Sequence, residues 1–196
     1  DDCVCIKAAS YPDPAANRNV KNILVEHCVL WNAEPGNAVE IGYEVRCDEI
    51  SDITFRDLDI VHCEYEGNQS GGVLTIHNAD RAHIHDIVYE DIRVEDAQEK
   101  FVDIKVLDSK YSLDRKRGSV ENIYFRNVEI LNGNFPVSII RGFEMHTEMS
   151  RPRNIYFDNV VVLGKQVESP SDLHMVVELS DDILFNGTAH AKRNPF

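Results

Sequence analysis

A nine-residue pattern that recurs along the chain limits the folds open to it. Each copy begins with Asn or Asp followed by Ile, at positions 22, 52, 86, 122 and 154. Successive copies are therefore 30, 34, 36 and 32 residues apart. Repeats of this length indicate stacked units that bury their apolar faces against one another, so the pattern predicts a solenoid.

Within each copy the apolar residues alternate, skip one position and alternate again. In the second copy Ile53 and Phe55 precede the skip, and Leu58 and Ile60 follow it. Alternation at period 2 is typical of strands with one buried face, so the chain must turn a corner at the skip to keep both pairs inward. The residue before the skip is always of a type that tolerates the left-handed αL conformation: His27, Asp57, Asp91, Asn127 or Asn159.

A further short strand is predicted in each coil, outside the nine-residue copies. These strands are Cys3–Lys7, Ala38–Gly42, Val73–His77, Val102–Val106, Pro136–Ile140 and Met175–Leu179. The sequence thus predicts an all-β parallel β-helix of about six coils, with residues 1–188 as one domain and 189–196 as a polar tail. A leucine-rich solenoid fits less well, because the inward positions favour Ile, Val and Phe and no helical period is present.

Composition narrows the range of partners. The 20 Lys and Arg against 34 Asp and Glu give a formal net charge of −14, which argues against nucleic acid or an anionic membrane as a partner. No apolar run approaches the roughly 20 residues that span a bilayer. The five cysteines are odd in number and include no Cys-x-x-Cys pair, so we expect packed thiols and neither a metal nor a cofactor.

Two adjacent carboxylates, Asp1 and Asp2, lead into the first predicted strand. Paired carboxylates can divide acid and base roles, because each raises the other's pKa and one can hold a proton while its neighbour is ionised. A charged strand end is the alternative. Adjacent strand residues point to opposite faces, so both carboxylates reach one face only if the strand is bent or begins at Asp2.

Three segments of the chain resemble the active-site coils of the polygalacturonase-like glycoside hydrolases, family 28 and its clan. They are Asp1-Asp2-Cys3-Val4-Cys5-Ile6-Lys7, then Gly36-Asn37-Ala38-Val39-Glu40-Ile41-Gly42, then Gly72-Val73-Leu74-Thr75-Ile76-His77. The resemblance implies a right-handed parallel β-helix with a sugar-binding groove, of which this chain corresponds to the C-terminal coils. It also implies inverting hydrolysis, with Asp1 as general acid and Asp2 helping to activate water. A secreted or periplasmic location is expected with it.

Two motifs differ from those of the family. The family's Gly-His-Gly is Gly36-Asn37-Ala38 here, and its Arg-Ile-Lys is Thr75-Ile76-His77. The second change removes two cations that would pair with a uronate. We therefore expect a neutral or differently charged glycan as substrate and not strict polygalacturonate.

The predicted substrate-binding residues are Lys7, Trp31, Asn37, Glu40, Glu44, Thr75 and His77. For several of them a structural role is an alternative. Trp31 could stack on a sugar ring or pack in the core, Glu40 and Glu44 could line the groove or form a solvated face, and His77 could form hydrogen bonds or lie exposed.

Three functions remain open from the sequence. A glycoside hydrolase is the first, a β-helical carbohydrate-binding or scaffold module without chemistry is the second, and a polysaccharide lyase is the third. We also expect some self-association, because a coil at the end of a parallel β-helix exposes an unpaired sheet edge.

Overall fold

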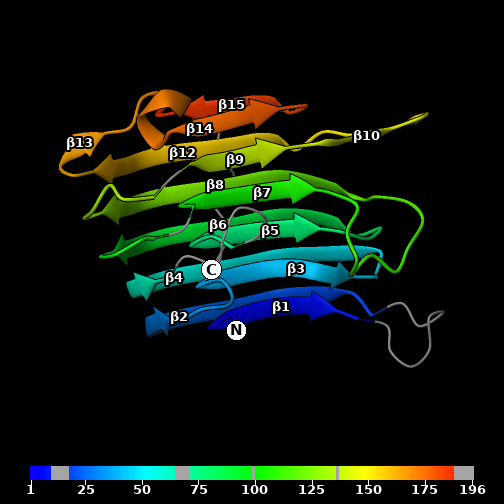
Figure 1. Cartoon of the computed structure of the whole chain (residues 1–196), viewed down its shortest axis with the longest axis horizontal. Helices are drawn as coiled ribbons and strands as arrows, with labels where there is room; N and C mark the ends of the chain where they lie inside the picture. Colours follow the sequence, from blue (N-terminus) through cyan, green and yellow to red (C-terminus); the bar gives the residue numbers. More distant parts are fainter. Residues whose placement is uncertain (10–17, 65–70, 99, 136, 188–196) are drawn as a thin grey trace.

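The computed structural model describes residues 1–9, 18–64, 71–98, 100–135 and 137–187. Over these residues the chain is all-β and forms a parallel β-helix of about five turns, which confirms the predicted fold class. One sheet of short strands lies in front of a sheet of longer strands in Figure 1. The predicted tail at 189–196 lies outside the described residues.

The first sheet contains six parallel strands in the order β1-β3-β5-β7-β9-β14. They are β1 (Val4–Ala8), β3 (Val39–Val45), β5 (Leu74–Asn78), β7 (Val102–Val106), β9 (Ser138–Arg141) and β14 (Met175–Glu178). These strands correspond to the six predicted outside the repeated pattern, with small shifts at their ends. Pro136, where one of them was expected to begin, lies outside the described residues.

The second sheet holds the repeated pattern. Its parallel strands are β2 (Val20–Asn32), β4 (Glu49–Cys63), β6 (His83–Val94), β8 (Ser119–Ile130), β12 (Arg153–Val162) and β15 (Asp181–Phe185). The short β13 (Lys165–Gln166) pairs antiparallel with β12. Equivalent residues of successive copies lie in register, so Ile53 pairs with Ile23 on one side and with Ile87 on the other.

Each copy contains two corners where the sequence predicted one. The predicted row adopts positive φ angles from 50° to 56°, at His27, Asp57, Asp91, Asn127 and Asn159. A second row, five residues earlier in each copy, has φ from 55° to 57° at Asn22, Asp52, Asp86, Asn122 and Asn154. Asn and Asp tolerate this conformation better than other non-glycine residues, so both rows let a long strand bend around the core.

Side-chain hydrogen bonds connect the corners of neighbouring coils. Asn127 Nδ2 donates to Asp91 Oδ1 at 2.9 Å, and Asn159 Nδ2 donates to Asn127 Oδ1 at 2.8 Å. In the second row Asn122 and Asn154 form the equivalent bonds at 3.2 and 3.1 Å. These ladders stabilise the stacking of successive coils.

The interior consists of rows of like residues. Ile6, Ile41, Ile76, Ile104 and Ile140 form the buried row of the first sheet. Opposite them, an aromatic stack runs through the second sheet with ring centroids 4.7 to 5.1 Å apart, at Phe55, Tyr89, Phe125, Phe157 and Phe185. Such rows bury apolar area in every coil and so stabilise the β-helix along its length.

Some features were not predicted. A hairpin of β10 (Phe143–Met145) and β11 (Glu148–Ser150) extends from the fifth coil, and a single 3₁₀ turn, η1 (Pro170–Leu173), precedes β14. All five cysteines are free, and Cys47 and Cys63 are buried as expected of packed thiols. Cys3 is instead exposed, because it lies before the first residue of β1.

Candidate functional site

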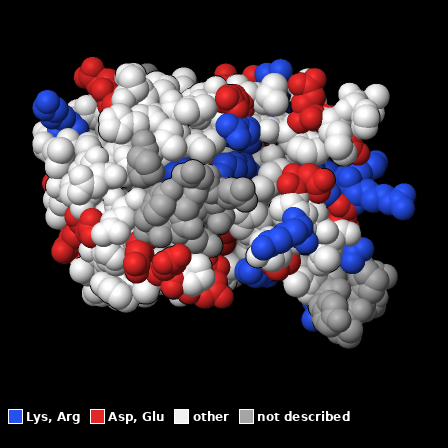
Figure 2. All heavy atoms as spheres, in the orientation of Figure 1, with Lys and Arg blue, Asp and Glu red and all other residues white. Residues whose placement is uncertain are grey.

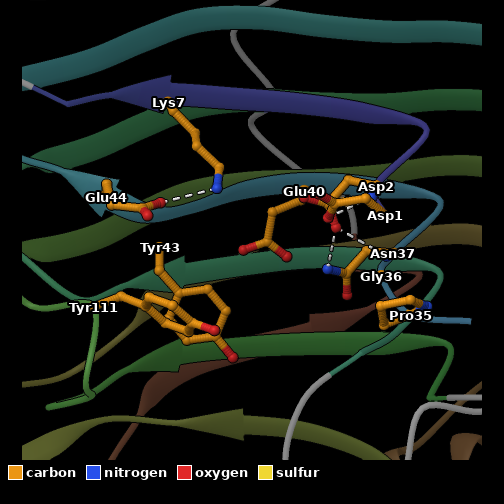
Figure 3. A pocket seen from close by; sticks show the side chains of 10 residues that line it. All are labelled: Asp1, Asp2, Lys7, Pro35, Gly36, Asn37, Glu40, Tyr43, Glu44 and Tyr111. Atoms are coloured by element: carbon orange, nitrogen blue, oxygen red, sulfur yellow. Dashed lines mark hydrogen bonds and ion pairs between the residues drawn. The ribbon is translucent and has the colours of Figure 1, made fainter.

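A pocket of about 420 Å³ lies on the outer face of the first sheet, at its first two strands (Figure 3). A cavity of this volume is large enough for a small ligand or a sugar unit. It is lined by Asp1, Asp2, Lys7, Pro35, Gly36, Asn37, Glu40, Tyr43, Glu44 and Tyr111. Six of the nine residues that the sequence singled out therefore meet here: Asp1, Asp2, Lys7, Asn37, Glu40 and Glu44.

Asp1 and Asp2 both line the pocket because β1 begins only at Val4, so the two residues precede the regular strand. The backbone N–H and the side-chain Nδ2 of Asn37 donate to Asp2 Oδ1 at 2.9 and 2.7 Å and orient its carboxylate. The backbone of Gly36 lies directly against this pair. A Cβ at Gly36 would come within 2.5 Å of the Asp1 carbonyl carbon, so only glycine fits this approach.

A bulge in β3 brings two more side chains to the pocket. Ile6 pairs with Ile41 and Ala8 pairs with Val45, so Lys7 alone lies opposite three residues of β3. The extra residues move Tyr43 and Glu44 to the outer face, where Lys7 Nζ lies 2.9 Å from Glu44 Oε2. Bulges of this kind often redirect side chains next to functional sites.

Glu40 lies in the wall of the pocket, and its carboxylate is bound from the next coil. The Thr75 hydroxyl donates to Glu40 Oε2, and His77 Nδ1 lies 3.0 Å from Glu40 Oε1. Thr75 and His77 are completely buried and do not line the pocket. The structure therefore does not bring these two predicted residues into the pocket lining, because both belong to β5 and contact Glu40 from the neighbouring strand.

The buried charges continue into a third coil. His77 Nε2 lies 3.2 Å from Asp103 Oδ2, and that oxygen accepts from Lys105 Nζ at 2.8 Å with Lys100 Nζ at 3.5 Å. We call Glu40, Thr75, His77, Asp103, Lys100 and Lys105 the buried charge chain. Both ring nitrogens of His77 face carboxylate oxygens, an arrangement that suits a doubly protonated imidazole.

The charge chain shifts the pKa values of its members. Burial disfavours the charged imidazole, but the negative charges of Glu40 and Asp103 outweigh it and raise the pKa of His77 to about 9. Burial also disfavours the ionised Asp103, yet the bond from His77 and the nearby lysines hold the pKa of that carboxyl below its usual value. Burial lowers the pKa of Lys105. His77 is therefore a cation at neutral pH.

Two tyrosines that the sequence analysis did not select form another part of the pocket. The rings of Tyr43 and Tyr111 lie 5.4 Å apart at 56°, and the Tyr43 ring packs on buried His77 at 4.6 Å. Figure 3 shows the two rings side by side below Glu44 and Glu40. Aromatic rings at a pocket wall can stack on the apolar face of a sugar.

The loop that carries Tyr111 is fixed by a buried aspartate. Asp80 Oδ1 accepts from the backbone N–H groups of Leu113 and Asp114 at 2.6 and 2.7 Å. Arg117 binds the same loop from inside through the Ser112 hydroxyl at 2.7 Å. These bonds hold Tyr111 against Tyr43 although nearly 70 residues separate the two in sequence.

Trp31 does not line the pocket. It belongs to β2 in the second sheet, its side chain is 62% exposed, and its ring stacks on His62 at a centroid distance of 5.3 Å. The sequence placed it beside the groove because it precedes the loop that leads to Asn37. The chain uses that loop to pass from one sheet to the other, which separates Trp31 from the predicted site.

The surface around the site carries charges of both signs. On the face shown in Figure 2, the described Lys and Arg side chains stand in small separate groups beside Asp and Glu. No group of three or more His, Cys, Asp or Glu residues arranged to hold a metal ion is found among the described residues. In the described ranges no helix has the length and apolar content needed to cross a bilayer.

No protein-family model, curated protein or solved structure matches this chain significantly. The resemblance to the polygalacturonase-like glycoside hydrolases therefore depends on the motif residues alone. What the chain can do must be argued from the chemistry of the pocket.

Proposed function

We propose that this protein hydrolyses a glycosidic bond in an oligosaccharide or polysaccharide that binds in the pocket. The observation that carries the proposal is the gathering of Asp1, Asp2 and Glu40 around one cavity with the tyrosine pair in its lining. Carboxylic acids that can give and take protons are the groups that glycoside hydrolysis requires. Aromatic rings with hydrogen-bonding groups are suited to binding the sugar.

In the proposed reaction Asp1 acts as the acid and protonates the leaving oxygen. Water attacks the anomeric carbon from the opposite face, and an ionised carboxylate accepts its proton. Asp2, which is held by two hydrogen bonds from Asn37, helps to position and activate this water. Attack from the opposite face inverts the configuration at the anomeric carbon.

The charges of the pocket favour a substrate without carboxylates. Four acidic side chains line it, and its one lysine, Lys7, is paired with Glu44. A uronate would meet repulsion from Asp1 and Asp2, and among the described lining residues the one lysine is already paired with Glu44. Neutral glycans are therefore the preferred substrate class.

The test is hydrolysis of a panel of neutral and uronic-acid polysaccharides, with the anomers of the products identified by NMR. We expect turnover of a neutral glycan with inversion, and a loss of at least about 100-fold in kcat for Asp2→Asn. The matched control is Asp158→Asn, which changes an exposed residue of the second sheet. Retained configuration, or equal rates for Asp2→Asn and wild type, would contradict the mechanism.

Carbohydrate binding without hydrolysis is the second candidate, favoured by the tyrosine pair alone. Tyr43 and Tyr111 form a binding surface whether or not the carboxylates do chemistry. Calorimetry with the same glycans separates the two candidates. Binding with no turnover by the wild-type protein would support the second and exclude the first.

A further inference from the structure

The position of Glu40 sets it apart from the rest of the buried charge chain. Glu40 is only 1% exposed, yet it is the member of the buried charge chain that lines the pocket. Figure 3 shows the Glu40 carboxylate turned toward the space between Lys7 and the tyrosines. The remaining members of the chain belong to the next two coils, on β5 and β7 or just before β7.

We propose that Glu40 is the carboxylate that takes the proton from the attacking water, and that Thr75 and His77 are positioning residues for it. This inference rests on the proposed hydrolysis and adds a catalytic residue to it. The resemblance implies that Asp2 helps to activate water and assigns no catalytic role to Glu40. Here a carboxylate of the following coil occupies the same pocket as Asp2.

The hydrogen bonds of Glu40 leave part of its carboxylate free to accept a proton. A carboxylate has about four lone-pair positions, and Thr75 and His77 occupy one on each oxygen. Both contacts come from the neighbouring strand, so they fix the plane of the carboxylate. A proton acceptor held in one orientation is the arrangement that general-base catalysis needs.

Gly42, two residues after Glu40, leaves space for the Glu40 carboxylate to contact His77. A Cβ at Gly42 would lie 2.6 Å from Glu40 Oε1 and 2.4 Å from the His77 carbonyl oxygen, and the φ angle of Gly42 is +144°. Only glycine leaves room for the carboxylate to bend toward His77 there. The backbone is thus shaped around the Glu40 side chain.

A purely structural role fits the pattern of the sheet less well. The residues in register with Glu40 are Cys5, Thr75, Asp103 and Ile139, so the row does not repeat. Structural ladders in this protein repeat similar residue types, as the Asn and Asp side chains of the corner rows do. Burying a charged chain costs free energy that well-packed apolar residues would avoid, so its presence beside the pocket points to a function.

The spacing leaves room for a substrate. Cys5 pairs with Glu40, and Asp2 is three residues before Cys5. Asp2 contacts Asn37, which is three residues before Glu40 in the sequence. Asp1, Asp2 and Glu40 all line the same pocket of about 420 Å³, a volume that can hold a sugar unit with the attacking water.

Glu40 accepts a proton from water while the water oxygen bonds to the anomeric carbon. The bond from that carbon to the glycosidic oxygen breaks, and Asp1 gives its proton to the leaving oxygen. Glu40 is then protonated and Asp1 ionised, and proton exchange with solvent restores both.

The experiment compares Glu40→Gln with Glu129→Gln on the glycan that the wild-type protein hydrolyses. Glu129 is an exposed residue of β8 in the second sheet. We expect Glu40→Gln to lower kcat by about 10² to 10⁴-fold with a smaller change in KM, and Glu129→Gln to leave both unchanged. Azide should restore turnover of Glu40→Ala and give a glycosyl azide of inverted configuration, because azide needs no base.

A milder variant tests the positioning role. Thr75→Val removes the hydroxyl with little change of shape, and we expect kcat to fall by up to about 100-fold while KM and the circular dichroism spectrum are retained. A merely structural hydroxyl would change the melting temperature and leave the ratio of kcat to KM constant.

Three outcomes would overturn the inference. If Asp2→Asn is inactive while Glu40→Gln retains full kcat, the proposed hydrolysis is supported but Glu40 is not the general base. If Glu40→Gln raises KM alone, Glu40 binds substrate and does no chemistry. If the wild-type protein hydrolyses no glycan, the proposed function fails and this assignment fails with it.

Discussion

The second sheet repeats similar residue types from coil to coil at its corners and in its buried rows, whereas the outer face of the first sheet does not. In the second sheet Asn127 and Asn159 form a ladder with Asp91, and Phe125 stacks between two further rings. On the outer face of the first sheet each coil contributes a different residue, and oppositely charged side chains from neighbouring coils are buried against one another there. Both sheets are nevertheless built from parallel strands in register.

The difference separates the residues that hold the coils together from those that serve the pocket. A row of similar residues stabilises each contact between neighbouring coils in the same way, so the same residue types can be used in every coil. Unlike buried charges must instead be paired individually, which costs desolvation at each site. Proteins break a regular sequence pattern mainly at functional or strained sites. In this protein the pocket lies where the residues stop repeating from coil to coil.

The largest expected effect comes from removing the central cation of the buried charge chain. His77→Leu leaves Glu40 and Asp103 buried without their shared partner, and we expect it to lower the free energy of unfolding by about 3–5 kcal/mol. Urea denaturation measures this. The control is His27→Asn, at an exposed αL corner of the second sheet, with an expected loss below about 1 kcal/mol. If both variants lost the same free energy of unfolding, the proposed difference between the two sheets would be contradicted.

Stability should also depend on pH through His77. Its folded pKa of about 9 exceeds the ordinary 6.5, so the folded state binds the proton more tightly than the unfolded state. The stabilisation is complete below about pH 6.5 and is lost as pH rises through about 9, for a total near 3 kcal/mol. Denaturation at pH 6 and pH 10 measures it. A profile for His77→Gln as steep as that of the wild type would contradict this assignment.

A smaller effect is expected at a corner of the second sheet. Asn127→Ala places a Cβ-bearing residue without a local hydrogen bond at φ 51° and removes two ladder bonds, which should cost about 2 kcal/mol. Asn127→Gly removes the same bonds but tolerates the backbone angle, so about half that cost is expected. Thermal unfolding of both variants checks this. A glycine variant less stable than the alanine variant would exclude the conformational explanation.

The smallest effect should appear in binding alone. Tyr111→Ala removes one ring of the tyrosine pair, and we expect affinity for a neutral oligosaccharide to fall about 5- to 10-fold, which corresponds to one lost aromatic contact. Leu113→Ala, an exposed apolar residue of the same loop, is the control for calorimetry. A similar loss in the control would show that the loop acts as a whole.

Periodicity in the sequence was enough to predict the β-helix and one row of corners. The residue before each skip, such as Asp57, had to turn because the apolar alternation changes phase there. The other row, which includes Asp52, was missed because alternation only begins after it and no phase change marks the bend. The Asn or Asp that starts every copy could have indicated this second row of corners, because both residue types tolerate positive φ.

The pocket was predictable in part. Asp2, Asn37 and Glu40 follow from motifs near the start of two strands, and the structure brings them together. Tyr43 was missed because the bulge changes which side of β3 it faces, and Tyr111 because it comes from a loop two coils away. Neither a bulge nor a contact between distant loops leaves a periodic mark on the sequence.

The central claim is that the outer face of the first sheet carries the function and the second sheet does not. Its most direct test is NMR of isotope-labelled protein titrated with neutral oligosaccharides. We predict that amide shifts change at Asn37, Glu40, Tyr43 and Glu44, while those of Asn127 and Tyr124 on the second sheet are unchanged. Shifts confined to the second sheet, or none with any glycan, would contradict the account.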